Sequence, residues 1–242
     1  MLLEASGIVK QFGSLRAVDG ACLAIDRGEV VGLIGPNGAG KSTFFNCLAG
    51  EVRPEAGRII YKGADITALS PEAHARRGIA RTWQVPAVFA EMPVRDNVMV
   101  GAFLRHHHAP AARRKAEEVI AFTGLAQQAG APAGSLGTLG RKRLEIARAL
   151  ATEPELVLLD EALAGLNPTE TAAAIELVRS IHAAGITLVI VEHVMAVILS
   201  LAQRAVVFHQ GKVIAAGPPA AVIEDEAVIE AYLGARFRRR SA

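Results

Sequence analysis

The spacing of apolar residues along the chain predicts short strands that alternate with helices. The runs Val30–Ile34, Leu156–Asp160 and Thr187–Val191 are almost uninterrupted by polar residues. Strands that are apolar at every position are buried on both faces, which is typical of a parallel sheet covered by helices. Shorter strand-like runs occur at Arg58–Tyr61, Ala205–His209 and Val213–Ala216. The segment Pro168–Ala183 has Pro at its start and Ala-Gly just beyond its end, as helices often do. The pattern therefore predicts an α/β fold with a mostly parallel core sheet.

Two segments depart from this alternation. Residues 8–25 and 59–66 have a shorter period and many turn residues, which indicates an antiparallel edge. Between Val94 and Thr152 the residues Ala, Arg, Glu and Lys dominate with helical spacing, as expected of an inserted helical subdomain. We therefore predict a core at residues 1–93 and 153–234, a helical subdomain at 94–152 and a basic tail at 235–242.

Composition narrows the class of protein. A chain of 242 residues, half of them hydrophobic, can form a large core, and its net charge of +2 gives no field that would attract nucleic acid. The apolar runs are shorter than the ~18 residues that cross a bilayer, so a membrane role would need a partner. Cys22 and Cys47 have apolar neighbours and no metal-ligand spacing, so we expect buried free thiols in a reducing compartment.

A candidate phosphate-binding motif lies directly after the first core strand. The first eight of the nine residues that follow it fit the pattern G-x-x-x-x-G-K-[ST], and Thr43 completes the loop: Gly35, Pro36, Asn37, Gly38, Ala39, Gly40, Lys41, Ser42 and Thr43. Glycines let the loop curl so that its N–H groups converge on phosphate oxygens at the start of a helix. Lys41 adds a cation for the β- and γ-phosphates, and the Ser42 hydroxyl can ligate Mg²⁺. A strand before the loop and a helix-like segment after it complete the context, so the sequence predicts a nucleotide site.

Two other predicted strands end in groups that suit the same nucleotide. Ligand sites of open parallel sheets lie at the carboxyl ends of the strands. Asp160 and Glu161 end one strand, where Asp160 suits the Mg²⁺ sphere and Glu161 can polarise the attacking water. His193 follows another strand and could donate a hydrogen bond to the γ-phosphate.

In this order the motifs resemble the ATP-binding subunit of an ABC transporter over nearly the whole chain. The resemblance implies a P-loop ATPase of ABC type that hydrolyses ATP with Mg²⁺. It assigns Phe12 to adenine stacking, Gln84 to Mg²⁺ and water, Glu161 to catalysis and His193 to the switch histidine. Ala164–Asn167 resembles the loop that follows the catalytic glutamate in this family, the D-loop.

Finer motifs are similar to those of branched-chain amino acid importers, and most of all to the larger of their two ATPase subunits. They are Gly32–Asn37, Arg95–Gly101, Arg143–Leu150 and Val228–Gly234. The resemblance implies a head-to-tail dimer with a second, related ATP-binding subunit. It also implies two transmembrane permeases, an extracytoplasmic solute-binding protein and a peripheral place on the cytoplasmic face of the bacterial inner membrane. Alternatives are an importer of another small solute, such as an amide, urea or other amino acids, or a soluble ABC ATPase in DNA repair or translation. A regulatory module that binds nucleotide without turnover is a third possibility.

The chain departs from the family at the signature, which is normally Leu-Ser-x-Gly-Gln. Counting back from Arg143 without a gap places Leu139 where Gly belongs and Gly140 where Gln belongs. With a deletion of one residue, Thr138-Leu139-Gly140 becomes the counterpart of Ser-x-Gly, and only the Gln is lost. We prefer the second alignment, because a loop before a helix absorbs a deletion easily. Smaller departures are Trp83 for the usual Phe, Ala162 for Pro and Val194 for Asp.

Overall fold

The computed structural model describes residues 1–233, and these fall into two units. One unit combines Met1–Pro71 with the chain from Thr187 onward, and the other spans Glu72–Ile186. The predicted subdomain boundaries at residues 93/94 and 152/153 stay a prediction. The predicted basic tail at 235–242 lies outside the described residues.

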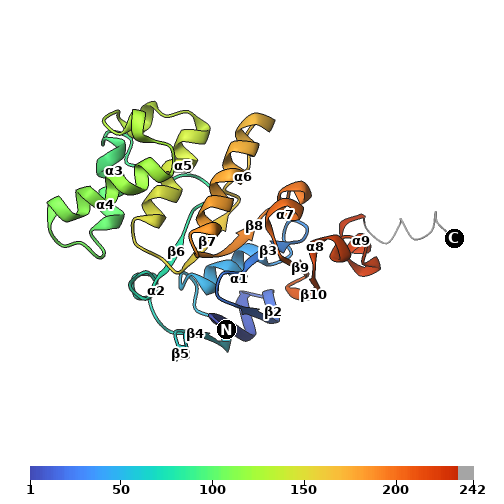
Figure 1. The fold of residues 1–242 in the computed structure, drawn as a ribbon. Helices are drawn as coiled ribbons and strands as arrows, with labels where there is room; N and C mark the ends of the chain where they lie inside the picture. The colour runs from blue at the N-terminus through green and yellow to red at the C-terminus, as the bar shows by residue number, and fades with distance from the viewer. Residues whose placement is uncertain (234–242) are drawn as a thin grey trace. The chain divides into compact units, whose positions relative to one another are not determined.

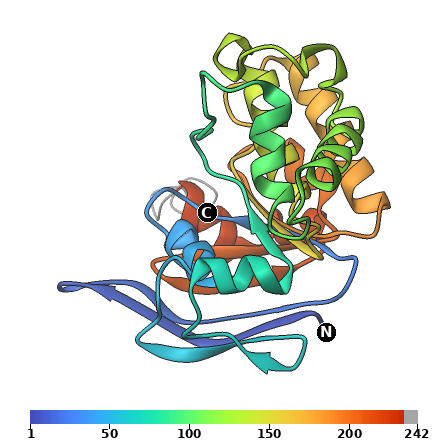
Figure 2. The same cartoon turned by 90° about the vertical axis from the view of Figure 1, so that its left-hand side faces the viewer.

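Two sets of strands build the first unit (Figure 1). An antiparallel sheet has the order β2-β1-β4-β5, formed by β1 (Leu3–Phe12), β2 (Leu15–Ile25), β4 (Ala56–Tyr61) and β5 (Ala64–Asp65). Figure 2 shows β1 and β2 as a long hairpin. In the other set β3 (Val30–Ile34) runs parallel to β8 (Thr187–Val191) and β9 (Arg204–His209), and β10 (Lys212–Gly217) runs antiparallel to β9. The predicted parallel core and antiparallel edge are thus confirmed.

Burial explains why the sequence of the core strands is so apolar. Every residue of β3 and of β8 is buried, so neither strand needs a polar face. The unit's helices are α1 (Lys41–Leu48), α7 (Met195–Leu201), α8 (Pro219–Val222) and α9 (Glu226–Leu233). Phe44 of α1 packs on Phe208 of β9 with ring centroids 5.1 Å apart, which ties the helix after the phosphate loop to the sheet.

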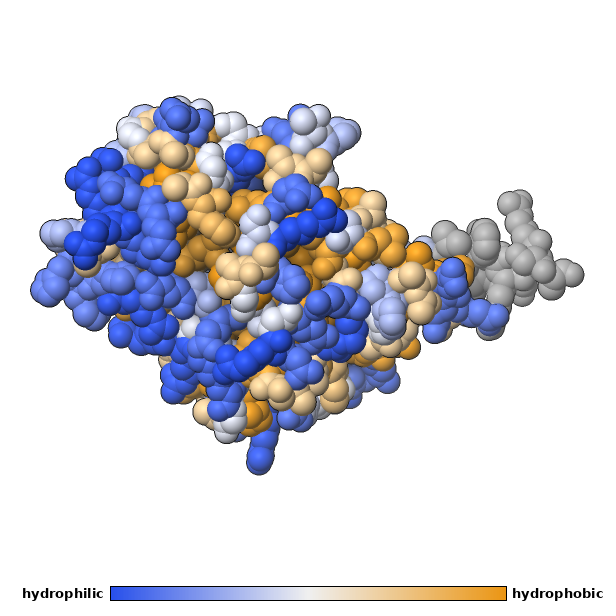
Figure 3. All heavy atoms as spheres, in the orientation of Figure 1, coloured by the Kyte–Doolittle hydropathy of each residue, from blue (hydrophilic) through white to orange (hydrophobic). Residues whose placement is uncertain are grey.

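The second unit is mostly helical. Its strands β6 (Ile79–Arg81) and β7 (Leu156–Asp160) pair in parallel. Its helices are α2 (Pro71–Arg77), which begins at the last residue before the boundary, α3 (Val94–Ala102), α4 (Ala109–Phe122), α5 (Thr138–Leu150) and α6 (Pro168–Ala183). Single 3-10 turns occur at Ala126–Gln128 and Ala133–Ser135. Polar side chains cover the side of α4 that faces the viewer in Figure 3, as expected for a helix with one buried stripe.

The prediction of two buried thiols is wrong for one of them. Cys47 on α1 is 1% exposed, but Cys22 is exposed. The reason is the alternation of side chains along β2, an edge strand of its sheet. Ala21 and Leu23 point into the core, and Cys22 between them points outward.

Candidate functional site

The phosphate loop links β3 to α1 within the first unit and depends on glycine at two places. Gly35 has φ +143, and a Cβ there would lie 2.2 Å from the carbonyl oxygen of Phe208. Gly40 has φ +101, and a Cβ there would lie 2.2 Å from the carbonyl oxygen of Ala17. Both positions therefore exclude a side chain through backbone contacts as well as through φ. The tip at Asn37 and Gly38 is exposed, as a ligand-binding loop requires.

Lys41 is the first residue of α1 and is only 8% exposed. Its Nζ donates hydrogen bonds to the carbonyl oxygens of Gly35 at 2.7 Å and Pro36 at 3.0 Å. The ammonium group is thus held within the loop that the sequence predicts for phosphate binding. The next residue, Ser42, is exposed, so its hydroxyl is accessible to a ligand.

The other predicted residues of this unit lie at strand ends. Phe12 ends β1 with half of its surface exposed, and Lys10 Nζ lies 5.2 Å from the ring centroid. His193 follows β8 with its side chain 54% exposed, and its Nδ1 lies 4.0 Å from Glu192 Oε2. Glu192 is fully buried, so its carboxyl group reaches the exposed imidazole only at the edge of contact distance.

One residue near the loop was not singled out from the sequence. Burial raises the pKa of the Tyr232 hydroxyl, and a hydrogen bond with the backbone of Gly35 opposes that rise. Tyr232 belongs to α9, so the last described helix contacts the first residue of the phosphate loop. The sequence carries only a weak signal for this contact, because some 200 residues separate the two positions.

The second unit holds the predicted acidic residues at the end of β7. Asp160 is 8% exposed, and its N–H donates to Thr82 Oγ1 at 3.1 Å. Its Oδ2 lies 3.3 Å from a guanidinium nitrogen of Arg81, the last residue of β6. Because β6 and β7 are parallel neighbours, both charged groups emerge at the same strand ends.

Glu161 is held in an unusual backbone conformation by its neighbours. Its φ is +45, a region that non-glycine residues occupy at a cost of about 1 kcal/mol or more. Lys142 Nζ donates to the Glu161 carbonyl oxygen at 3.1 Å, and Gln84 Nε2 donates to its carboxylate at 2.8 Å. The structure thus brings together Gln84, Asp160 and Glu161, three residues that the sequence assigned to one site.

The loop that follows Glu161 ends at a helix cap. Asn167 Oδ1 accepts a hydrogen bond from the Glu170 N–H at 2.9 Å, and the Glu170 carboxylate accepts one from the Asn167 N–H at 3.0 Å. This capping box and Pro168 explain why α6 begins where the sequence predicted. Asn167, which resembles a D-loop residue, therefore also has a local structural role.

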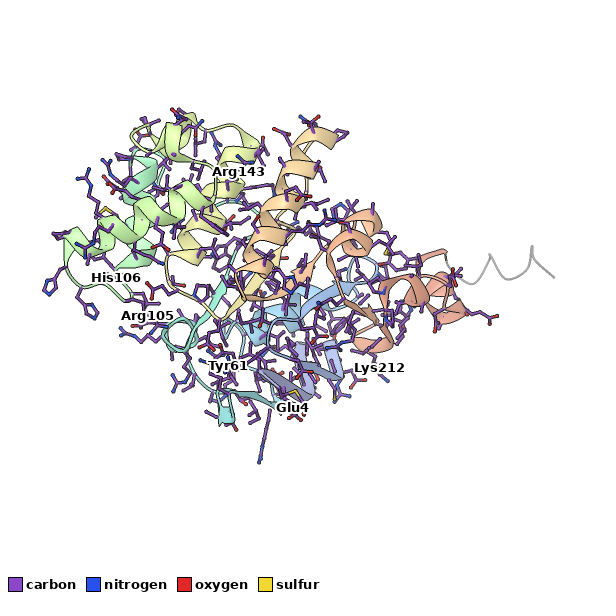
Figure 4. All side chains as sticks on the ribbon, viewed as in Figure 1. Glu4, Tyr61, Arg105, His106, Arg143 and Lys212 are labelled. Atoms are coloured by element: carbon purple, nitrogen blue, oxygen red, sulfur yellow. The ribbon has the colours of Figure 1, made fainter. Side chains whose placement is uncertain are left out.

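The altered signature lies at the start of α5. Gly137 is the N-cap in extended conformation, and Thr138 is the first helical residue. Gly140 lies in the first turn, where an added Cβ would lie 3.2 Å from Leu136 Cβ. A cavity of about 370 Å³ opens beside this turn, lined in part by Leu136, Leu139 and Arg143. Arg143, labelled in Figure 4, has a buried Nε without a hydrogen-bond partner. Gly140 is thus tightly packed against Leu136, which would have to shift by a few tenths of an ångström to admit a Cβ.

The predicted metal ligands suit a hard cation. Ser42, Gln84 and Asp160 offer a hydroxyl, an amide oxygen and a carboxylate, and Mg²⁺ prefers oxygen ligands. It usually takes only one or two carboxylates and completes its sphere with phosphates and water. Within residues 1–233 there is no group of three or more His, Cys, Asp or Glu side chains that could hold a metal without such help. The donors therefore fit Mg²⁺ that arrives with a nucleotide.

Comparison with known proteins decides the family. The model of the ABC transporter family matches residues 18–164, which include the phosphate loop, Gln84, Asp160 and Glu161. The chain belongs to the ABC transporter family. As a member of it, the chain is an ATP-binding cassette that hydrolyses ATP. A second model, described as a branched-chain amino acid ATP-binding cassette transporter, matches residues 212–238.

Individual relatives cover almost the whole cassette. It is 38% identical over 254 residues to the high-affinity branched-chain amino acid transport ATP-binding protein BraF of Pseudomonas aeruginosa, covering 96% of this chain and 98% of BraF. It is 36% identical over 237 residues to the lipopolysaccharide export system ATP-binding protein LptB of Acidithiobacillus ferridurans, covering 98% of each. The ADP conformation of MJ1267, an ATP-binding cassette of an ABC transporter, is similar in structure, with a TM-score of 0.88 and 32% identity over 96% of this cassette and 98% of that chain. Within residues 1–233 no helix of the cassette has the length and hydrophobicity needed to cross a membrane.

Proposed function

We propose that this cassette is the ATP-hydrolysing subunit of an importer of branched-chain amino acids. The observation that carries the proposal is the match of residues 212–238 to the branched-chain amino acid cassette model. Identity of 38% to BraF and to LivG of Escherichia coli K12, over 96% of the cassette, supports it. An importer of another small solute stays an alternative, because the motifs quoted above are similar in such relatives.

In the first unit we assign the residues that hold the nucleotide itself. Phe12 stacks on adenine, and the exposure of half of this residue supports that role. The loop Gly35–Thr43 surrounds the phosphates with backbone N–H groups, and Lys41 turns from the loop carbonyls to the β- and γ-phosphates. His193 donates a hydrogen bond to the γ-phosphate.

In the second unit we assign the residues that act on the attacking water. Glu161 accepts a proton as water attacks the γ-phosphorus, the bond from the β–γ bridging oxygen to that phosphorus breaks, and ADP and phosphate leave. Gln84 orients the carboxylate through the 2.8 Å hydrogen bond. Asp160, Ser42 and Gln84 would hold Mg²⁺, and Gln84 would also orient the water. When bound, Mg²⁺ would neutralise charge on the phosphates.

We propose that the cassette works in a head-to-tail dimer with a second, different ATP-binding subunit and two transmembrane permeases. Each ATP then lies between the phosphate loop of one subunit and the signature of the other. A solute-binding protein outside the cytoplasm supplies the amino acid indirectly, and the cassette lies on the cytoplasmic face of the inner membrane. Transport, rather than nucleic-acid repair or translation, is supported by the relatives' names.

Capture of the membrane partners tests this function. The tagged cassette is purified from detergent-solubilised membranes of its own organism, and the co-purifying permeases are identified and reconstituted with it in proteoliposomes. Leucine, isoleucine or valine, each with the associated binding protein, is expected to raise ATP turnover. Stimulation only by an amide or urea would contradict branched-chain amino acids as the cargo and identify that solute instead. Stimulation by lipopolysaccharide would favour export, which the 36% identity to LptB makes the second candidate.

The altered signature predicts two unequal ATP sites in such a dimer. This cassette brings Glu161 to one site and its unusual signature, Leu136–Gly140, to the other. We expect Glu161→Gln to remove most of the turnover of the reconstituted complex, and the same change in the partner's matching glutamate to remove less. Equal losses would contradict the asymmetry and leave the transport function standing.

A further inference from the structure

A basic side chain is packed against the aspartate that we assign to the metal. Arg81 and Asp160 end neighbouring parallel strands, and Arg81 lies opposite Leu158 in the register. Asp160 is two residues beyond Leu158, so its side chain leaves the same face of the sheet. The guanidinium reaches along this face, and one of its nitrogens lies 3.3 Å from Asp160 Oδ2. Both side chains are only 11% exposed, so solvent screens the pair weakly.

Trp83 holds the guanidinium in this place. The guanidinium carbon of Arg81 lies 4.0 Å from the centroid of the Trp83 ring, well within the range of a cation–π contact. Arg81 Nε also donates to the carbonyl oxygen of Thr82 at 3.3 Å. Trp binds a cation more strongly than Phe does, and Phe is the usual residue of the family at this position. The departure at Trp83 therefore strengthens the clamp on Arg81.

The main chain of Trp83 is in turn held by helix α5. The backbone N–H of Trp83 donates to Glu145 Oε1 at 2.6 Å, and Glu145 is 5% exposed. Burial raises the pKa of the Glu145 carboxyl, and the hydrogen bond from Trp83 is the first of the contacts that oppose the rise. The same helix begins at the altered signature. A continuous set of contacts thus runs from α5 through Trp83 and Arg81 to Asp160.

We propose that Arg81, clamped by Trp83, is the counter-ion of Asp160 and weakens its binding of Mg²⁺ until a nucleotide supplies negative charge. This inference rests on the proposed role of Asp160 as a metal ligand. A guanidinium beside a carboxylate opposes the approach of a divalent cation, since the two cations repel each other in a site of low polarity. The phosphates of ATP offset that repulsion, so the metal enters with the nucleotide. Arg81 is a positioning residue here, because it acts through Asp160.

Metal affinity tests the proposal without relying on turnover. Mn²⁺ replaces Mg²⁺, and free Mn²⁺ is measured by electron paramagnetic resonance with the full-length cassette, first without nucleotide and then with an ATP analogue whose β–γ bridge cannot be hydrolysed. Without nucleotide we expect Arg81→Gln to raise the affinity for Mn²⁺ about tenfold, the effect of removing one neighbouring positive charge, and with the analogue we expect a smaller rise. Arg81→Lys keeps the charge and is expected to stay within about threefold of the unchanged cassette.

A double-mutant cycle separates this inference from the proposed function. Asp160→Asn should weaken Mn²⁺ binding strongly, and in that background Arg81→Gln should have little further effect. If Asp160→Asn leaves the affinity unchanged, the assignment of Asp160 to the metal is wrong, and with it the proposal. If Asp160→Asn weakens binding but Arg81→Gln leaves the affinity unchanged or lowers it, only the role of Arg81 is wrong.

A loss of folding in Arg81→Gln would obscure its effect on metal affinity, because removing one partner of a buried ion pair is destabilising. Circular dichroism and the thermal midpoint of each variant show whether it folds. Should Arg81→Gln not fold, Trp83→Phe and Trp83→Ala keep the charge but loosen the clamp. The affinity for Mn²⁺ should then rise by a smaller factor than in Arg81→Gln, and by more for Trp83→Ala than for Trp83→Phe. If the affinity rises in neither variant, the proposal is overturned. Trp83 is the only tryptophan of the chain, so its fluorescence in the unchanged cassette should shift when Mg²⁺ and the analogue are added together.

Discussion

The side-chain amide of Gln84 donates a hydrogen bond of 2.8 Å to the carboxylate of Glu161, although 77 residues separate them. Glu161 itself has a left-handed backbone, and Lys142 holds its carbonyl oxygen. Strained backbone at a polar cluster is typical of functional sites, where the surrounding contacts offset its cost. The carboxylate that we assign to catalysis is therefore oriented from both its side chain and its main chain.

Glu161→Gln is expected to lower phosphate release by about 10²-fold or more, because an amide cannot accept the proton of the attacking water. ATP affinity should change by less than about threefold, since the amide keeps an oxygen near Gln84. Turnover and binding of a fluorescent ATP analogue are measured on the same preparations. Glu176→Gln, in the exposed ion pair with Arg179 on α6, is the matched control and should keep full turnover. Parallel loss of binding and turnover in Glu161→Gln would count against the catalytic role.

Gly40→Ala and Gly38→Ala form a matched pair within the phosphate loop. Gly38 has φ +77 with no atom within 4 Å of an added Cβ, whereas at Gly40 the Cβ would lie 2.2 Å from the Ala17 carbonyl oxygen. Gly38→Ala should therefore lower the free energy of unfolding by only about 1 kcal/mol, the cost of the left-handed backbone. Gly40→Ala should lower the free energy of unfolding by about 3 kcal/mol or more, because the backbone around Ala17 must also move. Denaturant titration gives both values, and equal losses would show that the loop is more adaptable than its contacts indicate.

Asn167→Ala tests whether this residue acts as a helix cap. Loss of the side-chain acceptor for the Glu170 N–H is expected to lower the free energy of unfolding by about 1 kcal/mol. Glu170→Gln keeps a side-chain oxygen for the Asn167 N–H and should cost less. If Asn167→Ala left stability unchanged but reduced turnover of the reconstituted dimer, its main role would lie at the partner subunit and not in the cap.

The two cysteines should react at very different rates with a thiol reagent. Cys22 is exposed, and its Sγ accepts a hydrogen bond from the Gly7 N–H at 3.2 Å. Burial raises the pKa of Cys47 from 9.0 to about 11, so that thiol is both covered and protonated at neutral pH. In native protein Cys47→Ser should keep the fast reaction and Cys22→Ser should lose it. Fast labelling of Cys22→Ser would show that α1 opens readily.

The same pKa shift predicts a loss of stability in alkaline solution. The folded state keeps the Cys47 proton that the unfolded state releases near pH 9, so the contribution of this thiol is complete below pH 9 and is lost as pH rises to about 11. The difference of about two between the pKa values of the folded and unfolded states corresponds to about 3 kcal/mol of unfolding free energy. Cys47→Ser should flatten this part of the stability profile, whereas Cys22→Ser should not alter it.

The sequence by itself determined the class of fold and the nucleotide chemistry. Continuous apolar strands such as β3 and β8 can be buried only between covered faces, and the phosphate loop carries its own geometry in its glycines and Lys41. The start of α6 was equally predictable, because a cap is a contact between near neighbours in the chain.

Tertiary structure decided the contacts between residues far apart in the chain. Nothing local in the sequence predicts that Arg81 meets Asp160, that Gln84 binds Glu161 or that Tyr232 contacts Gly35. The exposure of Cys22 depends on its sheet in the same way, since an apolar neighbourhood in sequence does not show which face of an edge strand is covered. Such contacts depend on strand order and register, which the chain fixes only when it folds.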